Sequence, residues 1–280
     1  MIQRKEKNMQ EHKGFFMPAE WAEHERTLME WPVREAMIYP ENNEIVCEEY
    51  AAVAKTISEF EPVTMLVNAN TAEQAKALCG DSIEYLTVPH NDAWCRDNGP
   101  TFLVDGEHHV SAVNWQFNAW GEKYLPCDLD NEVAQKVLEY YKVPFLNSPI
   151  VMEGGSIHVD GEGTLLTTRE CLLNRNRNPH LTQKEIEDEL KRCIGITKTI
   201  WLNHGLFGDE TDGHVDNVAC FARPGVVILQ VCEDDRDPNY AITLENLEIL
   251  RNTDDAKGRR IEVIKIPQPP ARFYEGSRLT

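Results

Sequence analysis

The sequence predicts a mixed α/β fold built from repeated units, and two observations support this prediction. First, segments of helical periodicity alternate with short runs rich in Val, Ile and Leu, most of which end at Gly, Pro or Asp-Gly. Second, two-residue hairpin turns recur at a nearly constant spacing, beginning at Asp105, Asp160 and Pro224. Such a period indicates supersecondary units that bury their apolar faces against their neighbours. We therefore predict one domain over residues 1–280, although the length alone suggests about two.

Helical periodicity is found at residues 45–60, 72–79, 131–142, 182–193 and 240–256. The fourth of these segments has the best marked start. Thr182 followed by Glu185 fits a capping box, in which the hydroxyl and the carboxylate each accept a bond from a free backbone N–H. Residues 1–13 are polar, and we predict that they are peripheral.

Apolar runs predict strands at residues 62–67, 83–88, 101–104, 110–115, 164–168, 197–202, 217–222, 226–231 and 261–266. Their order fits neither a coiled coil nor a doubly wound nucleotide-binding fold, and the sequence has no Gly-rich phosphate loop. The period of the turns places the next turn at about residue 280 to 290, after Thr280.

The formal net charge of −19 argues against partners such as nucleic acid or anionic membranes, because these need a basic surface that displaces counterions. The charge suits a small cationic ligand, and it also suits the simpler role of keeping the protein soluble. No apolar stretch reaches membrane-spanning length, and Met1–Lys7 lacks the apolar core of a signal peptide. We therefore expect a cytoplasmic protein whose eight cysteines are reduced thiols.

A histidine and a carboxylate stand close together in the sequence at His214 and Asp216, where a strand is predicted to begin. Residues two apart in extended chain point to the same face, so both side chains would emerge together. Histidine titrates near neutrality and suits general acid–base work, while a neighbouring carboxylate can hold a cationic substrate or orient the ring. A buried hydrogen-bonded pair and a metal-binding pair are the alternatives.

Two further acidic residues stand beside glycine-rich turns. Asp97 precedes an Asn-Gly-Pro turn, and Trp94 lies in the same segment. Asp97 could cap this turn, or it could clamp a guanidinium or ammonium group with the Trp94 ring as a flat wall. Glu153 precedes two glycines, which permit either a turn or close approach of the backbone to a ligand. A guanidinium presents N–H donors in a rigid fork, so such acidic groups around one histidine form a plausible guanidine receptor.

The motifs that contain these residues are Asn91–Pro100, Asn114–Gly121, Glu153–Asp160 and Asp212–Asp216. Together with Phe15–Pro32, they resemble agmatine deiminases of the guanidino-group-modifying superfamily, which includes peptidyl-arginine deiminase-like proteins. The resemblance covers nearly the whole chain. It implies a pseudo-fivefold α/β propeller of αββαβ-type units, formed by residues 1–280 as a single domain.

The resemblance also implies a reaction and a set of roles. Agmatine and water would yield N-carbamoylputrescine and ammonia, a step in polyamine metabolism toward putrescine biosynthesis, with no metal or organic cofactor. Asp97 and Asp216 would grip the guanidinium, His214 would transfer protons, and Glu153 would complete the polar cradle. The partner would be a small cationic guanidine, with no nucleic acid or membrane, and a homo-oligomer is left open.

One motif of the family is missing from the sequence. Similar enzymes carry the nucleophilic cysteine in a Gly-rich motif that ends in Ile-His-Cys, and this sequence has no such motif. We therefore expect a propeller that is incomplete at its C-terminus and no nucleophile among the eight cysteines. Cys220 is no substitute, because a strand residue four positions after Asp216 would lie about 13 Å away. The 280-residue chain is accordingly expected to hydrolyse agmatine slowly or not at all.

Two other classes of function are consistent with the same residues. The first is a non-catalytic guanidine-binding or interaction protein. The second is a metal-dependent hydrolase in which His214, Asp216 and Glu153 are the ligands, since histidine and carboxylates are common metal ligands. This last alternative ranks lowest, because the sequence places no second histidine near His214 and Asp216.

Overall fold

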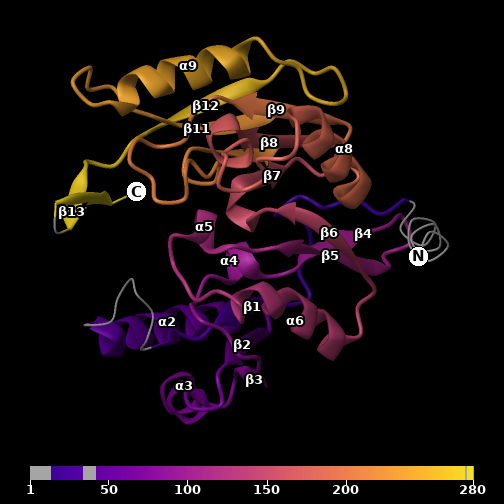
Figure 1. Cartoon of the computed structure of the whole chain (residues 1–280), viewed down its shortest axis with the longest axis vertical. Helices are drawn as coiled ribbons and strands as arrows, with labels where there is room; N and C mark the ends of the chain where they lie inside the picture. The colour runs from indigo at the N-terminus through magenta and orange to yellow at the C-terminus, as the bar shows by residue number, and fades with distance from the viewer. Residues whose placement is uncertain (1–13, 34–41, 275, 280) are drawn as a thin grey trace. The chain divides into compact units, whose positions relative to one another are not determined.

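The computed structural model of the chain describes residues 14–33, 42–274 and 276–279 (Figure 1). The N-terminal segment predicted to be peripheral lies outside these ranges. The chain forms two compact units. Unit 1 comprises Met1–Glu20, Thr101–Gln116 and Pro144–Thr280, and unit 2 comprises Trp21–Pro100 and Phe117–Val143.

Unit 2 is built on a parallel sheet of β1 (Thr27–Glu30), β2 (Val63–Val67) and β3 (Glu84–Thr87), with β2 in the centre. Helices α2 (Asn43–Ser58) and α3 (Ala72–Cys79) pack on one face, and α6 (Val133–Tyr141) supplies apolar side chains to the other.

Both faces of β2 are covered. Met65 and Val67 join the core beneath α2 and α3, whereas Leu66 packs with Val133 and Val137 of α6. This alternation follows from the two-residue period of a strand, and it explains why the run 63–67 is apolar throughout.

Unit 1 contains three sheets with one topology: an antiparallel hairpin followed by a third strand that returns parallel. The first is β4 (Thr101–Val104), β5 (Val110–Gln116) and β6 (Phe145–Val151); the second is β7 (Ile157–Val159), β8 (Thr164–Thr168) and β9 (Lys198–Leu202); the third is β10 (Ala219–Arg223), β11 (Val226–Val231) and β12 (Glu262–Pro267). The repeat that the turn spacing predicts is confirmed at the level of strand pairing.

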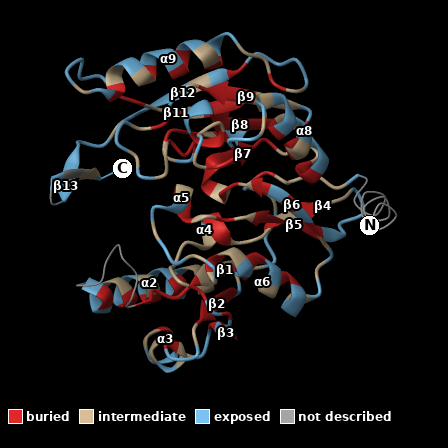
Figure 2. Cartoon of the chain, in the orientation of Figure 1, coloured by how far each residue is buried: buried red, intermediate tan, exposed pale blue. Residues whose placement is uncertain are grey.

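Helical segments occupy the crossovers of these sheets. The β8–β9 connection contains α7 (Arg169–Leu172) and α8 (Gln183–Ile194), and the β11–β12 connection contains α9 (Asn239–Arg251), which runs along β11 and β12 (Figure 1). The capping box predicted at Thr182 and Glu185 is confirmed at the start of α8. Buried residues concentrate on β7, β8 and β9 (Figure 2). None of the helices in the described ranges is long and apolar enough to cross a membrane.

The prediction of two-residue turns is wrong for two of the three hairpins. Only the turn at Pro224 has two residues, whereas the loops 105–109 and 160–163 are longer. The aspartate side chain explains the difference. Asp105 Oδ1 accepts the backbone N–H groups of residues 107 and 109, and Asp160 Oδ1 accepts those of residues 162 and 164, so each carboxylate closes its own loop.

Other strand predictions need smaller corrections. Strand β6 was not predicted, because its sequence Phe-Leu-Asn-Ser-Pro-Ile-Val contains polar residues and a proline, which is tolerated on an edge strand such as this one. An antiparallel pair of β13 (Arg272–Tyr274) and β14 (Ser277–Leu279) occurs before the position at which the turn period places the next hairpin.

Candidate active site

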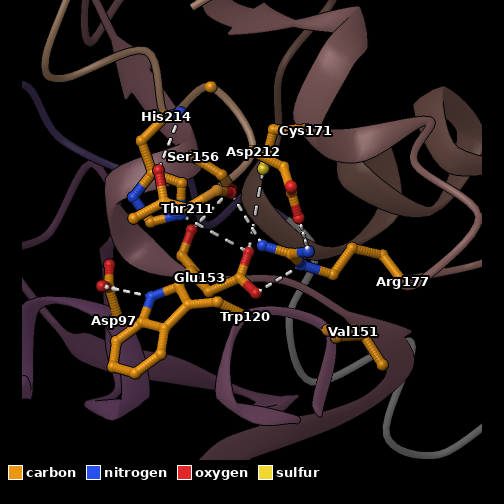
Figure 3. Close-up of polar contacts among 12 residues, drawn as sticks. Asp97, Trp120, Val151, Glu153, Ser156, Cys171, Arg177, Thr211, Asp212 and His214 are labelled. Atoms are coloured by element: carbon orange, nitrogen blue, oxygen red, sulfur yellow. Dashed lines mark hydrogen bonds and ion pairs between the residues drawn. The ribbon is translucent and has the colours of Figure 1, made fainter. Parts of the chain in front are cut away.

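A fully buried ion pair lies in unit 1 between Glu153 and Arg177, and both side chains are 0% exposed. Glu153 directly follows β6 and Met152, and it precedes the short 3-10 helix η3 (Gly154–Ser156). Arg177 Nε donates to Glu153 Oε1 at 2.7 Å (Figure 3). The same guanidinium donates to Asp212 Oδ2 at 2.7 Å and to the carbonyl oxygen of Thr211 at 2.9 Å. Arg177 thereby links the Glu153 segment to the loop that precedes His214.

The second oxygen of Glu153 faces the imidazole and a thiol. Glu153 Oε2 lies 3.7 Å from His214 Nε2 and 3.9 Å from Cys171 Sγ (Figure 3). On its other side, His214 Nδ1 lies 4.0 Å from Asp216 Oδ1. The imidazole therefore has one carboxylate near each ring nitrogen.

The loop before His214 is held by hydrogen bonds to the side chain of its own Asp209 and to that of Thr168 in β8. Asp209 Oδ2 accepts the N–H groups of Gly213 and His214, and Thr168 Oγ1 donates to the carbonyl oxygen of Gly213 at 2.6 Å. Gly213 has φ +90°, a left-handed conformation in which glycine avoids the steric cost of a side chain. Its ideal Cβ position would also lie 2.9 Å from a Glu170 carboxylate oxygen.

The prediction that His214 and Asp216 stand in extended chain is wrong. Val215 O accepts the N–H groups of Val218 and Ala219, so a turn precedes β10, which begins only at Ala219. The two side chains are nevertheless close, because the turn brings His214 Nδ1 and Asp216 Oδ1 to 4.0 Å.

Electrostatics differ between the acid and the thiol. Burial alone would raise the pKa of Glu153, but His214 and the positive charge of Arg177 outweigh it and hold that pKa below its ordinary value. Burial raises the pKa of Cys171 to about 11, so its sulfur is a thiol near neutral pH. Burial also raises the pKa values of other cysteines, namely Cys79, Cys95, Cys127, Cys193 and Cys220.

In unit 2, Asp97 lies on the single-turn helix α4 (Cys95–Asn98) and is buried. Trp120 Nε1 donates to Asp97 Oδ2 at 3.0 Å (Figure 3). The Trp120 ring is the centre of an aromatic cluster in which it makes edge-to-face contacts with Trp94, Phe117 and Tyr124. Trp94 therefore packs on Trp120, and its carbonyl oxygen accepts the N–H of Asp97.

Trp120 sits in an unusual backbone segment. Four successive residues, Ala119, Trp120, Gly121 and Glu122, have φ between +52° and +88°. A left-handed conformation costs about 1 to 2 kcal/mol for each residue other than glycine, so surrounding contacts must maintain it. Asn118 Oδ1 accepts the N–H of Gly121 at 2.9 Å, and the hydrogen bond of Trp120 to Asp97 is a second restraint.

The structure thus places His214, Asp216 and Glu153 together in unit 1, and Asp97 and Trp94 together in unit 2. Sequence reasoning missed Arg177, Cys171 and Trp120. Arg177 stands in an Asn-Arg-Asn-Arg-Asn-Pro stretch, and nothing there distinguishes it from Arg175. Trp120 had a usable signal, because it lies in one of the motifs that carry the family resemblance.

Comparison with known proteins identifies the family. The chain matches the Porphyromonas-type peptidyl-arginine deiminases over residues 16–280. A protein of Legionella pneumophila is 50% identical over 268 residues, which are 95% of this chain and 77% of the relative. An agmatine deiminase of Pseudomonas syringae pv. syringae is 48% identical over 270 residues, which are 93% of this chain and 72% of that protein.

Solved structures agree with this assignment. The agmatine deiminase of Enterococcus faecalis superimposes with a TM-score of 0.89 at 37% identity, covering 96% of this chain and 77% of that one. A C. jejuni agmatine deiminase with substrate bound superimposes with a TM-score of 0.84 at 32% identity, covering 95% and 77%. These matches confirm an α/β fold of the deiminase type. The chain therefore belongs to the family of Porphyromonas-type peptidyl-arginine deiminases.

Proposed function

We propose that this chain is an agmatine deiminase, a hydrolase that acts on a C–N bond of a guanidine. The observation that carries the proposal is the imidazole of His214 between two carboxylates, Glu153 and Asp216. The named relatives from Pseudomonas and Enterococcus support the same reaction and favour it over a non-catalytic guanidine-binding protein or a metal-dependent hydrolase. The small guanidine agmatine is the substrate, and its product lies on a route of polyamine metabolism toward putrescine.

In the proposed reaction, Asp216 and Asp97 accept N–H groups of the guanidinium, and His214 protonates the departing ammonia. Support for Asp97 comes from unit 2, where Trp120 Nε1 donates to its carboxylate. Glu153 contributes only one oxygen, because Arg177 occupies Oε1 and leaves Oε2 on the side of His214. Its negative charge stabilises the imidazolium form that donates the proton.

The attacking thiolate of the family belongs to a Gly-rich motif ending in Ile-His-Cys, which this sequence lacks. Accordingly, the proposal assigns the nucleophile to none of the chain's own cysteines. The raised pKa values of Cys171 and Cys220 agree with this assignment, because a protonated thiol is a poor nucleophile.

The proposal extends to the fold and to the setting of the protein. Each antiparallel hairpin with its parallel third strand is one blade of a pseudo-fivefold propeller, and residues 1–280 belong to one propeller domain. Support comes from the three such sheets of unit 1, β4–β6, β7–β9 and β10–β12. We also propose a cytoplasmic location.

Calorimetric titration with agmatine tests the proposed substrate without requiring turnover. We expect agmatine to bind, and putrescine, which has the amine but no guanidinium, to bind at least about 10-fold more weakly. Asp216→Asn and Asp97→Asn should each weaken agmatine binding by about 10-fold or more, because a hydrogen bond to a charged group contributes about 1.5 to 3 kcal/mol. Asp188→Asn on the exposed face of α8 removes the same charge and should leave binding unchanged.

Equal binding of agmatine and putrescine would contradict a guanidine site. An effect of Asp216→Asn without one of Asp97→Asn would remove Asp97 from the proposal. Turnover is tested by ammonia release from agmatine, compared between this chain and the same chain extended by a Gly-rich Ile-His-Cys segment from a relative. We expect only the extended chain to release ammonia at a measurable rate, and equal rates would refute the assignment of the nucleophile.

A further inference from the structure

Three buried side chains of unit 1 combine the three ligand types that Zn²⁺ binds in proteins: the carboxylate of Glu153, the thiol of Cys171 and the imidazole of His214. One ligand atom from each lies within 4.8 Å of the others. The side chains come from three separate segments, the residues after β6, the helix α7 and the loop before β10, so their convergence is a property of the fold.

Two of the three separations between the ligand atoms are close to those around one tetrahedral ion. Zn²⁺ binds thiolate sulfur at about 2.3 Å and imidazole nitrogen or carboxylate oxygen at about 2.0 to 2.2 Å, so neighbouring ligand atoms lie about 3.3 to 3.7 Å apart. Glu153 Oε2 lies 3.7 Å from His214 Nε2 and 3.9 Å from Cys171 Sγ, within a few tenths of an ångström of that range (Figure 3). Side-chain adjustments of this size need no movement of the backbone.

The remaining oxygen of the carboxylate is already fixed. Arg177 Nε holds Glu153 Oε1 at 2.7 Å, and this contact orients Oε2 toward the other two ligands. Outer partners of this kind orient a ligand and contribute to metal affinity. Asp212 offsets the positive charge of Arg177, because its Oδ2 accepts from Arg177 Nη1 at 2.7 Å. Glu153 and the Cys171 thiolate would therefore supply most of the negative charge that balances the metal ion.

We propose that Glu153, Cys171 and His214 bind one thiophilic divalent cation of the Zn²⁺ type, and that the bound ion blocks the site. Mg²⁺ and Ca²⁺ prefer oxygen ligands and should not compete. A metal on His214 Nε2 prevents that nitrogen from carrying a proton, and it also places a positive charge where the guanidinium would approach. The blocking role rests on the proposed function, whereas the binding itself does not.

The sulfur binds a metal as a thiolate, so metal binding displaces the thiol proton of Cys171. The thiol proton leaves to solvent and the sulfur lone pair forms the metal bond, so no oxidant or reductant is required. Because the ligands bind the ion in their deprotonated forms, the apparent affinity should fall as the pH is lowered.

The test is a titration of the metal-free chain with Co²⁺, which substitutes for Zn²⁺ and reports its ligands by absorption. We expect one equivalent to bind with a thiolate-to-cobalt charge-transfer band and the visible bands of tetrahedral Co²⁺, and Zn²⁺ to remove both. Cys171→Ser should abolish the charge-transfer band and weaken binding by more than about 100-fold, since even the outer partners of a metal ligand contribute about 10 to 100-fold. Cys193→Ser, at a buried cysteine of α8, is the matched control and should leave the band intact.

Absence of a charge-transfer band in the unsubstituted chain, or its survival in Cys171→Ser, would overturn the proposal. Zn²⁺ X-ray absorption on the unsubstituted chain gives a result that does not depend on how a variant folds: one sulfur at about 2.3 Å supports the site, and a shell of nitrogen and oxygen alone contradicts it. Agmatine should weaken Co²⁺ binding. If the cobalt bands form but agmatine does not change the affinity of the chain for Co²⁺, the metal site is supported and the blocking role is contradicted.

Discussion

Two buried glutamates, one in each unit, have opposite electrostatics. Glu153 of unit 1 is 0% exposed and Glu30 of unit 2 is 1% exposed, so burial penalises the charge of both. Arg177 and His214 outweigh that penalty for Glu153 and lower its pKa. In the described ranges, no cationic side chain forms an ion pair with Glu30. Burial raises the pKa of Glu30 well above the ordinary value, the nearby Asp130 raises it further, and the hydrogen bond from Asn98 lowers it. The partner, not the depth of burial, decides whether a buried carboxyl is charged.

Arg177→Met should have the largest effect on stability, because it leaves Glu153 buried without the guanidinium that pairs with it. We expect a loss of about 3 to 5 kcal/mol in the free energy of unfolding, the usual result of removing one member of a buried ion pair. Urea denaturation at pH 7 measures it. Adding Glu153→Gln to this variant should recover part of the loss, because the uncompensated charge is then gone. Failure of the second substitution to recover any stability would show that Arg177 acts only through its contacts with Asp212 and Thr211.

Glu153→Gln alone should cost about 2 to 3 kcal/mol at pH 7, because it removes the charge that Arg177 Nε contacts at 2.7 Å. The depressed pKa fixes the sign of the pH dependence. The contribution of Glu153 is complete above its ordinary pKa of 4.5 and disappears as the pH falls through the lower value of the folded state. Unfolding measured from pH 7 down to pH 3 should show the two proteins converging; a constant difference would mean that the charge of Glu153 does not matter.

Trp120→Phe keeps an aromatic ring in its cluster and removes the donor to Asp97. We expect a loss of about 1 kcal/mol in unfolding free energy, the typical net contribution of one hydrogen bond, together with weaker agmatine binding. Trp201→Phe is a suitable control. It also removes a hydrogen bond from Trp Nε1 to a carboxylate, but the acceptor is Glu187 and not Asp97. If both variants weaken agmatine binding equally, the effect is general and Asp97 has no special dependence on Trp120.

Glu30→Gln should have the smallest effect of the four on the free energy of unfolding at acidic pH. The pH dependence of its effect should be opposite to that of Glu153→Gln. The raised pKa means that Glu30 stabilises the fold when protonated and that this contribution is lost as the pH rises from 4.5 through the folded value. The variant has no such loss, so its stability relative to the parent chain should increase with pH, opposite in sign to Glu153→Gln. Unfolding curves of both proteins at pH 4 and pH 8 test this prediction. If the stability of the variant relative to the parent chain falls as the pH rises, Glu30 is ionised in the folded state.

The sequence predicts elements well where one physical signal is strong. The apolar runs of β8 and β11, and the capping box of α8, are found where they were predicted. Local signals are misleading where side chains reorganise the backbone. The carboxylates of Asp105 and Asp160 turn expected two-residue turns into longer loops, and the turn at Val215 replaces an expected extended segment.

The candidate site could be predicted only in part, because its residues meet through tertiary contacts. His214, Asp216 and Glu153 have recognisable neighbours in the sequence, and the first two are close together in it. Arg177 and Cys171 become visible as parts of the site only when α7 and the following loop are folded against the end of β6. Spacing alone does not report such a contact.

Three loops of unit 1 are each closed by an aspartate side chain through the same pattern of hydrogen bonds. In the loops that begin at Asp105, Asp160 and Asp255, the aspartate N–H donates to the carbonyl oxygen four residues later, and its Oδ1 accepts the N–H groups two and four residues later. The residue three positions after the aspartate has a positive φ in each loop; these residues are His108, Gly163 and Gly258. Five-residue cassettes of this design should be exchangeable between the three positions, and His108 marks the one copy whose sharpest bend is made without glycine.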